Sequence, residues 1–300
     1  MSAPLTVRAA AKINLHLGVG AVRDDGFHPL DTVYQAVSLY DDVQVEPAEE
    51  WSVSTELASY LDDTALPAVG ANIVDAVGRL LGRSGSPGAK VQISKAIPVA
   101  GGMAGGSADA AAAMVALDRL WDLETPDGEL LALAAELGSD VPFALLGGTA
   151  RGRGRGEVVT PLPDHGSYAW VVVPDELGLS TPAVYRHYDK LFPDAPAEPR
   201  PASRVLEALF LGDSGRLAVA MHNDLEEAAI DLRPDLGGLL ARGEAEGALR
   251  GLVSGSGPTV VFLCESPESA QAVAAALQPQ HPVTLLAHGP VAGAHLVEVM

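Results

Sequence analysis

The sequence predicts an α+β fold with antiparallel strands, divided into two domains near residue 160. At 300 residues the chain is long for one compact unit and comfortable for two. Its residues are 48% hydrophobic but only 5% aromatic, so Ala, Val and Leu must fill the core, as suits helices packed on sheets. Strand-like and helix-like patterns alternate in both halves. We therefore expect domains over residues 1–160 and 161–300.

In the first half, apolar residues recur with period 2 in several short runs and with helical spacing in others. Gly26 closes a turn signal after Arg23, and Pro98 ends the last strand. Strands are expected at 5–7, 13–19, 31–39, 42–46 and 91–97, and helices at 71–81, at about 107–120 and at 127–137. The run Val141-Pro142-Phe143 restarts the chain after a break.

The second half repeats this mixture around a proline-rich loop at 193–201. Ser266 has the residue type and position to cap a helix that ends at Leu277. Strands are expected at 168–173, 259–264, 283–287 and 294–299, and a further strand is expected to end near residue 253. Helices are expected at 203–211, 217–230 and 236–246.

Charge and cysteine usage exclude several classes of protein. The net charge of −20 leaves no basic footprint for nucleic acid or an anionic membrane. The single cysteine, Cys264, excludes an internal disulfide, and its apolar surroundings indicate a buried, inert thiol rather than a catalytic one. No run approaches the length of a membrane span, and the N-terminus lacks a signal-peptide pattern. We expect a cytoplasmic protein, monomeric or weakly dimeric, that acts on a small molecule.

A glycine-rich loop joins a predicted strand to a predicted helix. Residues without side chains let backbone N–H groups point into one concavity, and the helix N-terminus adds free N–H groups and a positive dipole end. This context favours a phosphate site over a simple packing turn. Walker-loop and protein-kinase signatures are absent, so the loop belongs to another class. The loop comprises Pro98, Val99, Ala100, Gly101, Gly102, Met103, Ala104, Gly105, Gly106, Ser107 and Ala108.

Lys12 and Asp140 are the candidate catalytic residues. Lys12 is one of only four lysines and lies at the head of a strand, where an ammonium can neutralise a carboxylate or a transferring phosphoryl group. The alternative is a lysine on an edge strand. Asp140 lies in a break, where it is either a general base toward a hydroxyl or a helix-cap or turn aspartate.

Two further stretches have an open interpretation. The basic run 151–156, which alternates Arg and Gly, is interpreted as a mobile surface turn, with phosphate contact as the alternative. The segment 254–259 is either a tight hairpin turn or a second backbone wall beside the phosphate loop.

Together these pieces resemble the GHMP small-molecule kinase superfamily. The resemblance rests on the order of Lys12-Ile13-Asn14-Leu15, the glycine-rich loop, Gly138–Pro142 and Ser254–Thr259, and it spans nearly the whole chain. Within the superfamily the sequence is most similar to the 4-diphosphocytidyl-2-C-methyl-D-erythritol kinases, through residues 11–15, 25–28, 138–143 and 223–226. The resemblance implies an N-terminal domain like ribosomal protein S5 domain 2, a ferredoxin-like C-terminal domain, and an active site between them.

The resemblance also implies the chemistry. That family uses ATP and Mg²⁺ to phosphorylate the 2-hydroxyl of its cytidine diphosphate-linked substrate. Asp140 would be the base, Lys12 would hold it ionised and steady the moving phosphoryl group, and residues 98–108 would wrap the ATP phosphates. Phe27, His28 and Tyr185 would form the cytidine pocket, with Asn14 nearby. No residue is assigned as a metal ligand.

Some positions depart from the family pattern. Alanine stands at 100 and 104 where glycine is usual and at 108 where a second serine is usual, and Phe27 replaces a common tyrosine. Because alanine tolerates positive φ poorly, we expect ordinary backbone at 100 and 104 and phosphate donors elsewhere in the loop. Another GHMP kinase, such as homoserine kinase, and a non-catalytic nucleotide-binding module are the alternatives.

Overall fold

The computed structural model describes residues 4–61, 70–82, 88–99, 101–175 and 177–297. Two long antiparallel strands, β1 (Leu5–Val19) and β2 (Leu30–Ala48), form the centre of the first sheet. The order through the sheet is β12-β1-β2-β4-β3, while β5 pairs with β2 and β6, and β8 pairs with β1. The other strands are β3 (Ser52–Leu57), β4 (Gly88–Lys95), β5 (Thr149–Gly154), β6 (Val158–Pro161), β8 (His222–Asn223) and β12 (His295–Val297).

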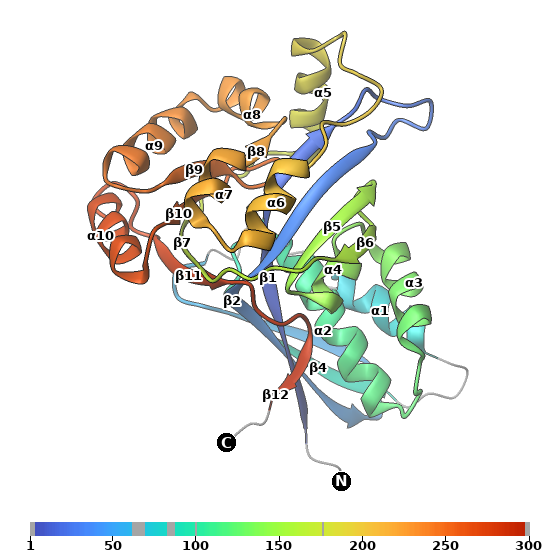
Figure 1. The fold of residues 1–300 in the computed structure, drawn as a ribbon. Coiled ribbons are helices and arrows are strands. Elements are labelled where there is room, and N and C mark those ends of the chain that lie inside the picture. The colour runs from blue at the N-terminus through green and yellow to red at the C-terminus, as the bar shows by residue number, and fades with distance from the viewer. Residues whose placement is uncertain (1–3, 62–69, 83–87, 100, 176, 298–300) are drawn as a thin grey trace.

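An alanine-rich helix, α2 (Gly105–Leu120), packs on this sheet against both β1 and β2. Its alanines from 110 to 113 are fully buried, so the small side chains allow the helix to approach the strands closely. α1 (Ile73–Leu81), α3 (Asp127–Leu137) and α4 (Val141–Leu146) pack beside it on one side of the sheet (Figure 1).

The second sheet has the antiparallel order β11-β7-β10-β9. In chain order this is 4-1-3-2, with helices after the first and third strands, which is the ferredoxin-like arrangement. Its strands are β7 (Tyr168–Val173), β9 (Arg250–Val253), β10 (Val260–Cys264) and β11 (Leu285–Gly289). Its helices are α5 (Thr181–Leu191), α6 (Ser203–Leu211), α7 (Ser214–Ala220), α8 (Glu226–Leu232), α9 (Pro234–Ala245) and α10 (Pro267–Leu277).

A buried polar bridge joins the two sheets. The Trp170 indole on β7 donates to the Gln35 side-chain oxygen on β2 at 3.0 Å, and the Gln35 amide nitrogen donates to Asp164. Both Trp170 and Gln35 are completely buried. The chain also returns twice to β1, because β8 pairs with it in parallel and β12 pairs with it in antiparallel fashion. The division at residue 160 stays a prediction.

The α+β fold with two halves is confirmed, and several elements match the expected bounds. The helices 127–137 and 203–211 and the strand 168–173 agree residue for residue. Ser266 caps α10 as expected, with its side chain accepting from the Ser269 amide. Cys264 is buried and its pKa is raised to about 11, which fits an inert thiol.

Other expectations were wrong. The helix expected at 217–230 is broken into α7, β8 and α8, because Asn223 pairs with β1 instead. Residues 151–154 of the Arg-Gly run belong to β5 rather than to a turn, while Arg155 and Gly156 lie in the turn that follows. The run after Asp140, to which no element was assigned, forms the short helix α4. The strands β3 and β6 and the helix α5 were not expected.

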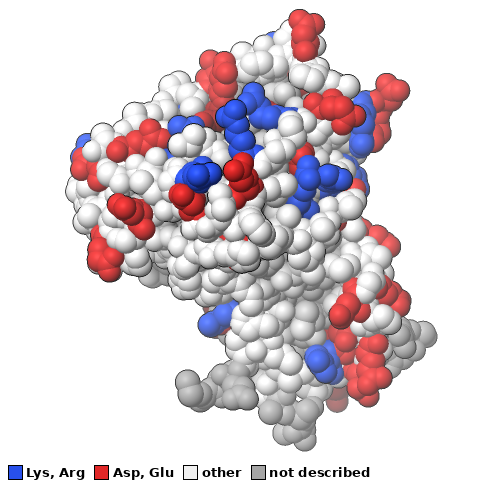
Figure 2. Space-filling view, in the orientation of Figure 1, with Lys and Arg blue, Asp and Glu red and all other residues white. Residues whose placement is uncertain are grey.

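One face of the molecule carries charges of both signs. Acidic and basic side chains are interspersed over the visible face, and acidic groups gather over the region of α3 (Figure 2). Within the described ranges, no helix is long and apolar enough to cross a membrane.

The bridge from Trp170 to Gln35 gives a stability prediction. Trp170→Phe removes the indole donor and leaves the buried Gln35 side-chain oxygen without a hydrogen bond. We therefore expect the free energy of unfolding to fall by about 1–3 kcal/mol. Urea unfolding measures this change. Trp121→Phe is the matched control, because the buried indole nitrogen of Trp121 has no partner among the described residues. Equal losses in the two variants would contradict a contribution from the bridge.

Candidate active site

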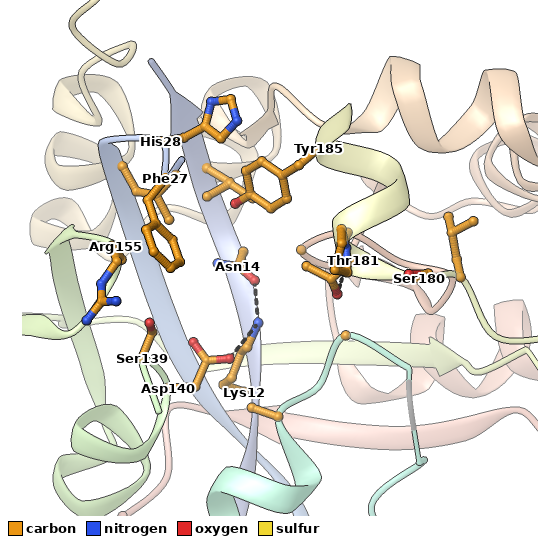
Figure 3. Close-up of a pocket in the computed structure, with 18 of the residues that line it drawn as sticks. Lys12, Asn14, Phe27, His28, Ser139, Asp140, Arg155, Ser180, Thr181 and Tyr185 are labelled. Atoms are coloured by element: carbon orange, nitrogen blue, oxygen red, sulfur yellow. Dashed lines mark hydrogen bonds and ion pairs between the residues drawn. The ribbon is translucent and has the colours of Figure 1, made fainter. Parts of the chain in front are cut away.

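A cavity of about 860 Å³ lies between the two halves, and we call it the catalytic cavity. Side chains from β1, β2, α4's start and α5 line it, together with parts of the glycine-rich loop and of the turn 254–257 (Figure 3). Of the residues predicted for the site, it is lined by Lys12, Asn14, Phe27, His28, Pro98, Gly101, Gly102, Ala104, Gly105, Gly106, Asp140 and Tyr185. The structure therefore brings together the candidate residues from widely separated parts of the chain.

Lys12 and Asp140 form an ion pair in the floor of the catalytic cavity, with 3.7 Å between Nζ and the carboxylate (Figure 3). Lys12 lies on a central strand and is 6% exposed, so it is not an edge lysine. Its Nζ also donates to Asn14 Oδ1 at 2.8 Å. Asp140 occupies the N-cap position of α4 but its side chain makes no capping bond, which leaves the carboxylate free to face Lys12.

The glycine-rich loop passes directly over Lys12. The backbone N–H of Lys12 donates to the carbonyl of Met103, and α2 begins at Gly105, two residues earlier than expected. A side chain at Gly106 would meet no atom within 4 Å, so the first turn of α2 opens onto free space. Such a helix start, with unpaired N–H groups and a positive dipole end, suits phosphate oxygens.

The turn 254–257 forms a second wall against the loop, so both interpretations of this segment apply. It joins β9 to β10 as a hairpin, and its Thr259 amide donates to the carbonyl of Gly101. A Cβ on Gly255 would lie 3.4 Å from Lys12 Nζ, which shows how closely the turn approaches the lysine. The Asn223 amide holds the turn by donating to the carbonyls of Val253 and Gly255.

The other end of the catalytic cavity carries aromatic side chains. The rings of His28 and Tyr185 lie 5.0 Å apart between centroids, and His28 Nδ1 donates to the Gly20 carbonyl at 2.8 Å. Burial and then the charge of Asp140 raise the pKa of Tyr185, so its hydroxyl stays neutral. Phe27 is 49% exposed at the mouth of the cavity. These rings and the buried imidazole form a partly polar end of the cavity, which we call the aromatic slot.

The cavity also contains residues that were not among the predicted site residues. Arg155 lies with its guanidinium 4.8 Å from the Phe27 ring centroid, and Arg186 lines the wall on α5. Tyr34 lies under Lys12, with 5.7 Å between Nζ and its ring centroid. The remaining polar lining residues are Ser139, Ser180, Thr181, Asp189 and Ser256. Arg155 belongs to the Arg-Gly run, for which phosphate contact was the less favoured interpretation.

A smaller cavity of about 390 Å³, which we call the loop cavity, lies against the loop and the start of α2. Lys95 there donates to both Asp41 and Asp109, at 2.6 and 2.7 Å. Burial raises the pKa of Asp109, whose second carboxylate oxygen has no partner among the described residues. Val99, Ser107 and Asn72 also line this cavity.

Two sequence-family models match the chain. One, described as GHMP kinases N terminal domain, covers residues 71–148, and one described as GHMP kinases C terminal covers residues 205–283. A 4-diphosphocytidyl-2-C-methyl-D-erythritol kinase from a Nocardioides species is 65% identical, over 97% of this chain and 99% of that protein. The kinase of the same description from Thermobifida fusca is 50% identical, over 99% and 100%.

The chain belongs to the 4-diphosphocytidyl-2-C-methyl-D-erythritol kinase family. A crystal structure described as 4-(cytidine 5'-diphospho)-2C-methyl-D-erythritol kinase is similar to it, with a TM-score of 0.76 and 32% identity over 94% of this chain and 98% of that one. Mevalonate kinase from L. major has a TM-score of 0.73 at 19% identity, over 98% of each chain, a likeness of fold alone. The two-domain GHMP kinase fold expected from the sequence is confirmed.

One departure from the family pattern turned out differently from our expectation. Ala104 has φ 57° and ψ 34°, the left-handed region, although alanine was expected to avoid it. This residue is the N-cap of α2, and its carbonyl accepts the first hydrogen bond of the helix, from the Ala108 amide. Ala100 lies outside the described residues.

The approach of the loop to the turn 254–257 predicts which glycine is essential. Gly102 has φ +78°, and a Cβ there would lie 2.4 Å from the Ser254 carbonyl oxygen. We expect Gly102→Ala to lower the free energy of unfolding by more than about 1 kcal/mol, because strain and overlap combine. Gly106→Ala is the control, with no atom within 4 Å of its Cβ and ordinary helical backbone. Urea unfolding of both variants tests this; equal stabilities would contradict the close approach.

Proposed function

We propose that this chain transfers the γ-phosphoryl group of ATP to the 2-hydroxyl of 4-diphosphocytidyl-2-C-methyl-D-erythritol, in non-mevalonate isoprenoid biosynthesis. The observation that carries the proposal is the pair of Lys12 and Asp140, which lies between a phosphate-binding loop and an aromatic slot. A kinase needs both substrates to meet at one base, and the catalytic cavity has that arrangement. Membership of the family supports the choice of acceptor.

Asp140 is the proposed general base. Its carboxylate is 30% exposed toward the cavity and makes no capping hydrogen bond to α4. It is therefore free to accept the proton of a substrate hydroxyl. The hydroxyl oxygen then attacks the γ-phosphorus in line with the departing ADP oxygen. The chemistry for the protein is mostly positioning and charge stabilisation.

Lys12 is the proposed electrostatic partner. Its ammonium is nearly buried and lies 3.7 Å from the carboxylate of Asp140, so it orients that group in the cavity. Asn14 Oδ1 fixes the ammonium from the opposite side at 2.8 Å. The same positive charge, in a site shielded from water, offsets the negative charge that develops on the transferring phosphoryl group.

The two substrates are assigned to the two ends of the site. We propose that residues 98–108 and the first turn of α2 hold the phosphates of ATP, with the adjacent loop cavity taking its remaining part. The described residues contain no group of three or more His, Cys, Asp or Glu side chains suited to a metal, so we propose that Mg²⁺ enters with ATP as part of the substrate. Phe27, His28 and Tyr185 are proposed to hold the cytosine by stacking and edge hydrogen bonds.

The location and assembly of the protein stay predictions from the sequence. We propose a cytoplasmic enzyme that works as a monomer or weak homodimer.

The role of Asp140 gives a kinetic prediction. We expect Asp140→Asn to lower kcat by about 10²-fold or more, because the amide cannot accept the proton, while ATP still binds. Steady-state kinetics and calorimetric titration with an ATP analogue measure the two quantities. Asp189→Asn removes the same charge from the same cavity and should leave kcat almost unchanged. An Asp140→Asn enzyme with the parent rate would remove the general base from the mechanism.

A panel of acceptors decides the substrate. We expect transfer to 4-diphosphocytidyl-2-C-methyl-D-erythritol and not to homoserine, mevalonate or galactose. Tyr185→Ala should raise the KM for that acceptor by about tenfold, since a lost aromatic plate under a base costs about 1–3 kcal/mol. Tyr40→Ala, on β2 outside the cavity, is the control. Transfer to homoserine with Tyr185 dispensable would favour a homoserine kinase, and nucleotide binding without any transfer would favour a non-catalytic module.

A further inference from the structure

A cavity of about 380 Å³ lies next to the start of α6, apart from the catalytic cavity, and we call it the outer cavity. Its volume is within the range of small-molecule sites. Its lining residues are His16, Arg200, Pro201, Ala202, Ser203, Arg204, Val205, Val219, Ala220, Met221 and His222. None of these residues lines the catalytic cavity.

The side chains of the outer cavity that carry a full charge are two arginines. Arg200, Arg204 and two histidines line it, and no carboxylate does. The chain has 39 acidic and 19 basic residues, so a lining without acids runs against its overall charge. Arg204 makes no ion pair among the described residues, and Arg200 approaches only Asp224, at 3.8 Å. Basic and acidic groups are interspersed over the region of α6 and α7 in Figure 2, so the basic character is confined to the lining of the cavity.

The start of α6 adds donors to this lining. The helix has Ala202 at its N-cap, which offers no side-chain cap. The backbone N–H groups of Ser203, Arg204 and Val205 have no partner in the described part of the chain. Free N–H groups at a helix start, next to two guanidinium groups, match the oxygens of a phosphate.

A buried histidine faces the same cavity. His16 is 2% exposed, and its Nε2 donates to the Arg200 carbonyl at 2.9 Å, while the described residues give Nδ1 no partner. Burial lowers the pKa of His16, so the ring is neutral and Nδ1 accepts a hydrogen bond. A phosphate that carries a proton, or a nearby hydroxyl of the ligand, supplies that donor.

The neighbouring cavity under the proline-rich loop shows the contrast. It shares Arg200 and His222 with the outer cavity but is also lined by Asp194, Glu198, Asp224 and Glu227. An anion that enters there meets four carboxylates. The outer cavity is therefore the one of the two that favours negative charge.

We infer that the outer cavity is a binding site for the phosphate group of a small phosphorylated molecule. Arg200, Arg204 and the amides of residues 203–205 bind the phosphate. The apolar side chains of Val205, Val219 and Met221 line the rest of the cavity and cover a short apolar part of the ligand. The site is separate from the phosphate loop and goes beyond the transfer reaction.

The test is calorimetric titration of the full chain with inorganic phosphate and with n-butyl phosphate. CDP and a non-hydrolysable ATP analogue first saturate the catalytic and loop cavities, so that phosphate has no access to the glycine-rich loop. We expect one further site per chain, with n-butyl phosphate tighter than inorganic phosphate because its chain removes apolar surface from water. Arg204→Gln should weaken this binding by about tenfold or more, and Arg200→Gln/Arg204→Gln should abolish it.

Arg216→Gln is the matched control. Arg216 lies on α7, next to α6, with the same charge and high exposure, but outside the cavity. Thermal unfolding checks that each variant is folded. Because the Arg204 side chain is exposed, we expect Arg204→Gln to leave the stability of the fold unchanged. Absence of a further site in the parent chain, or binding that Arg200→Gln/Arg204→Gln leaves unchanged, would overturn the inference. Inorganic phosphate binding as tightly as n-butyl phosphate would overturn the apolar part of it.

Discussion

The site depends on backbone packed against backbone above Lys12. The glycine-rich loop and the turn 254–257 come from different halves of the molecule, and they meet because Gly102 and Gly255 have no side chains. The Ser254 hydroxyl donates to the Gly102 carbonyl and the Thr259 amide donates to the Gly101 carbonyl. The Lys12 amide ties the loop to β1 by donating to the Met103 carbonyl. Since the same strand residue that carries the ammonium also holds the loop, the loop cannot move without disturbing the ion pair with Asp140.

A buried lysine, Lys95, also holds the glycine-rich loop in place. Lys95 ends β4 and binds Asp109 in α2, while Asp41 accepts from Lys95 and from the amides of residues 96 and 97. Buried ion pairs contribute little net stability, because desolvation offsets much of their attraction. Their clear effect here is geometric: the strand that enters the loop and the helix that leaves it are tied to one ammonium group.

The sequence was sufficient where local rules decide the outcome. The Ala-rich helix, the cap at Ser266 and the strand 168–173 follow from periodicity and capping, and the motif order identified the family. It was insufficient where contacts between residues distant in the sequence decide the local structure. Alternating Arg and Gly hides the period of β5, so residues 151–154 were interpreted as a surface turn. Arg155 does lie in the turn after β5, but its contact with the Phe27 ring was not expected. Ala104 adopts positive φ at the N-cap of α2, against the preference of alanine.

A bulge in β1 explains how one strand serves two cavities. The register with β2 shifts between Asn14 and His16, so Leu17 rejoins the face of Lys12 and Asn14 while His16 turns to the outer cavity. Buried hydrogen bonds connect the two sides: Lys12 to Asn14, Asn14 to Thr32, Thr32 to the His16 carbonyl, and the His16 ring to the Arg200 carbonyl. Because both ends of the Asn14 amide are engaged in this chain, Asn14 is better suited to positioning Lys12 than to recognising a base.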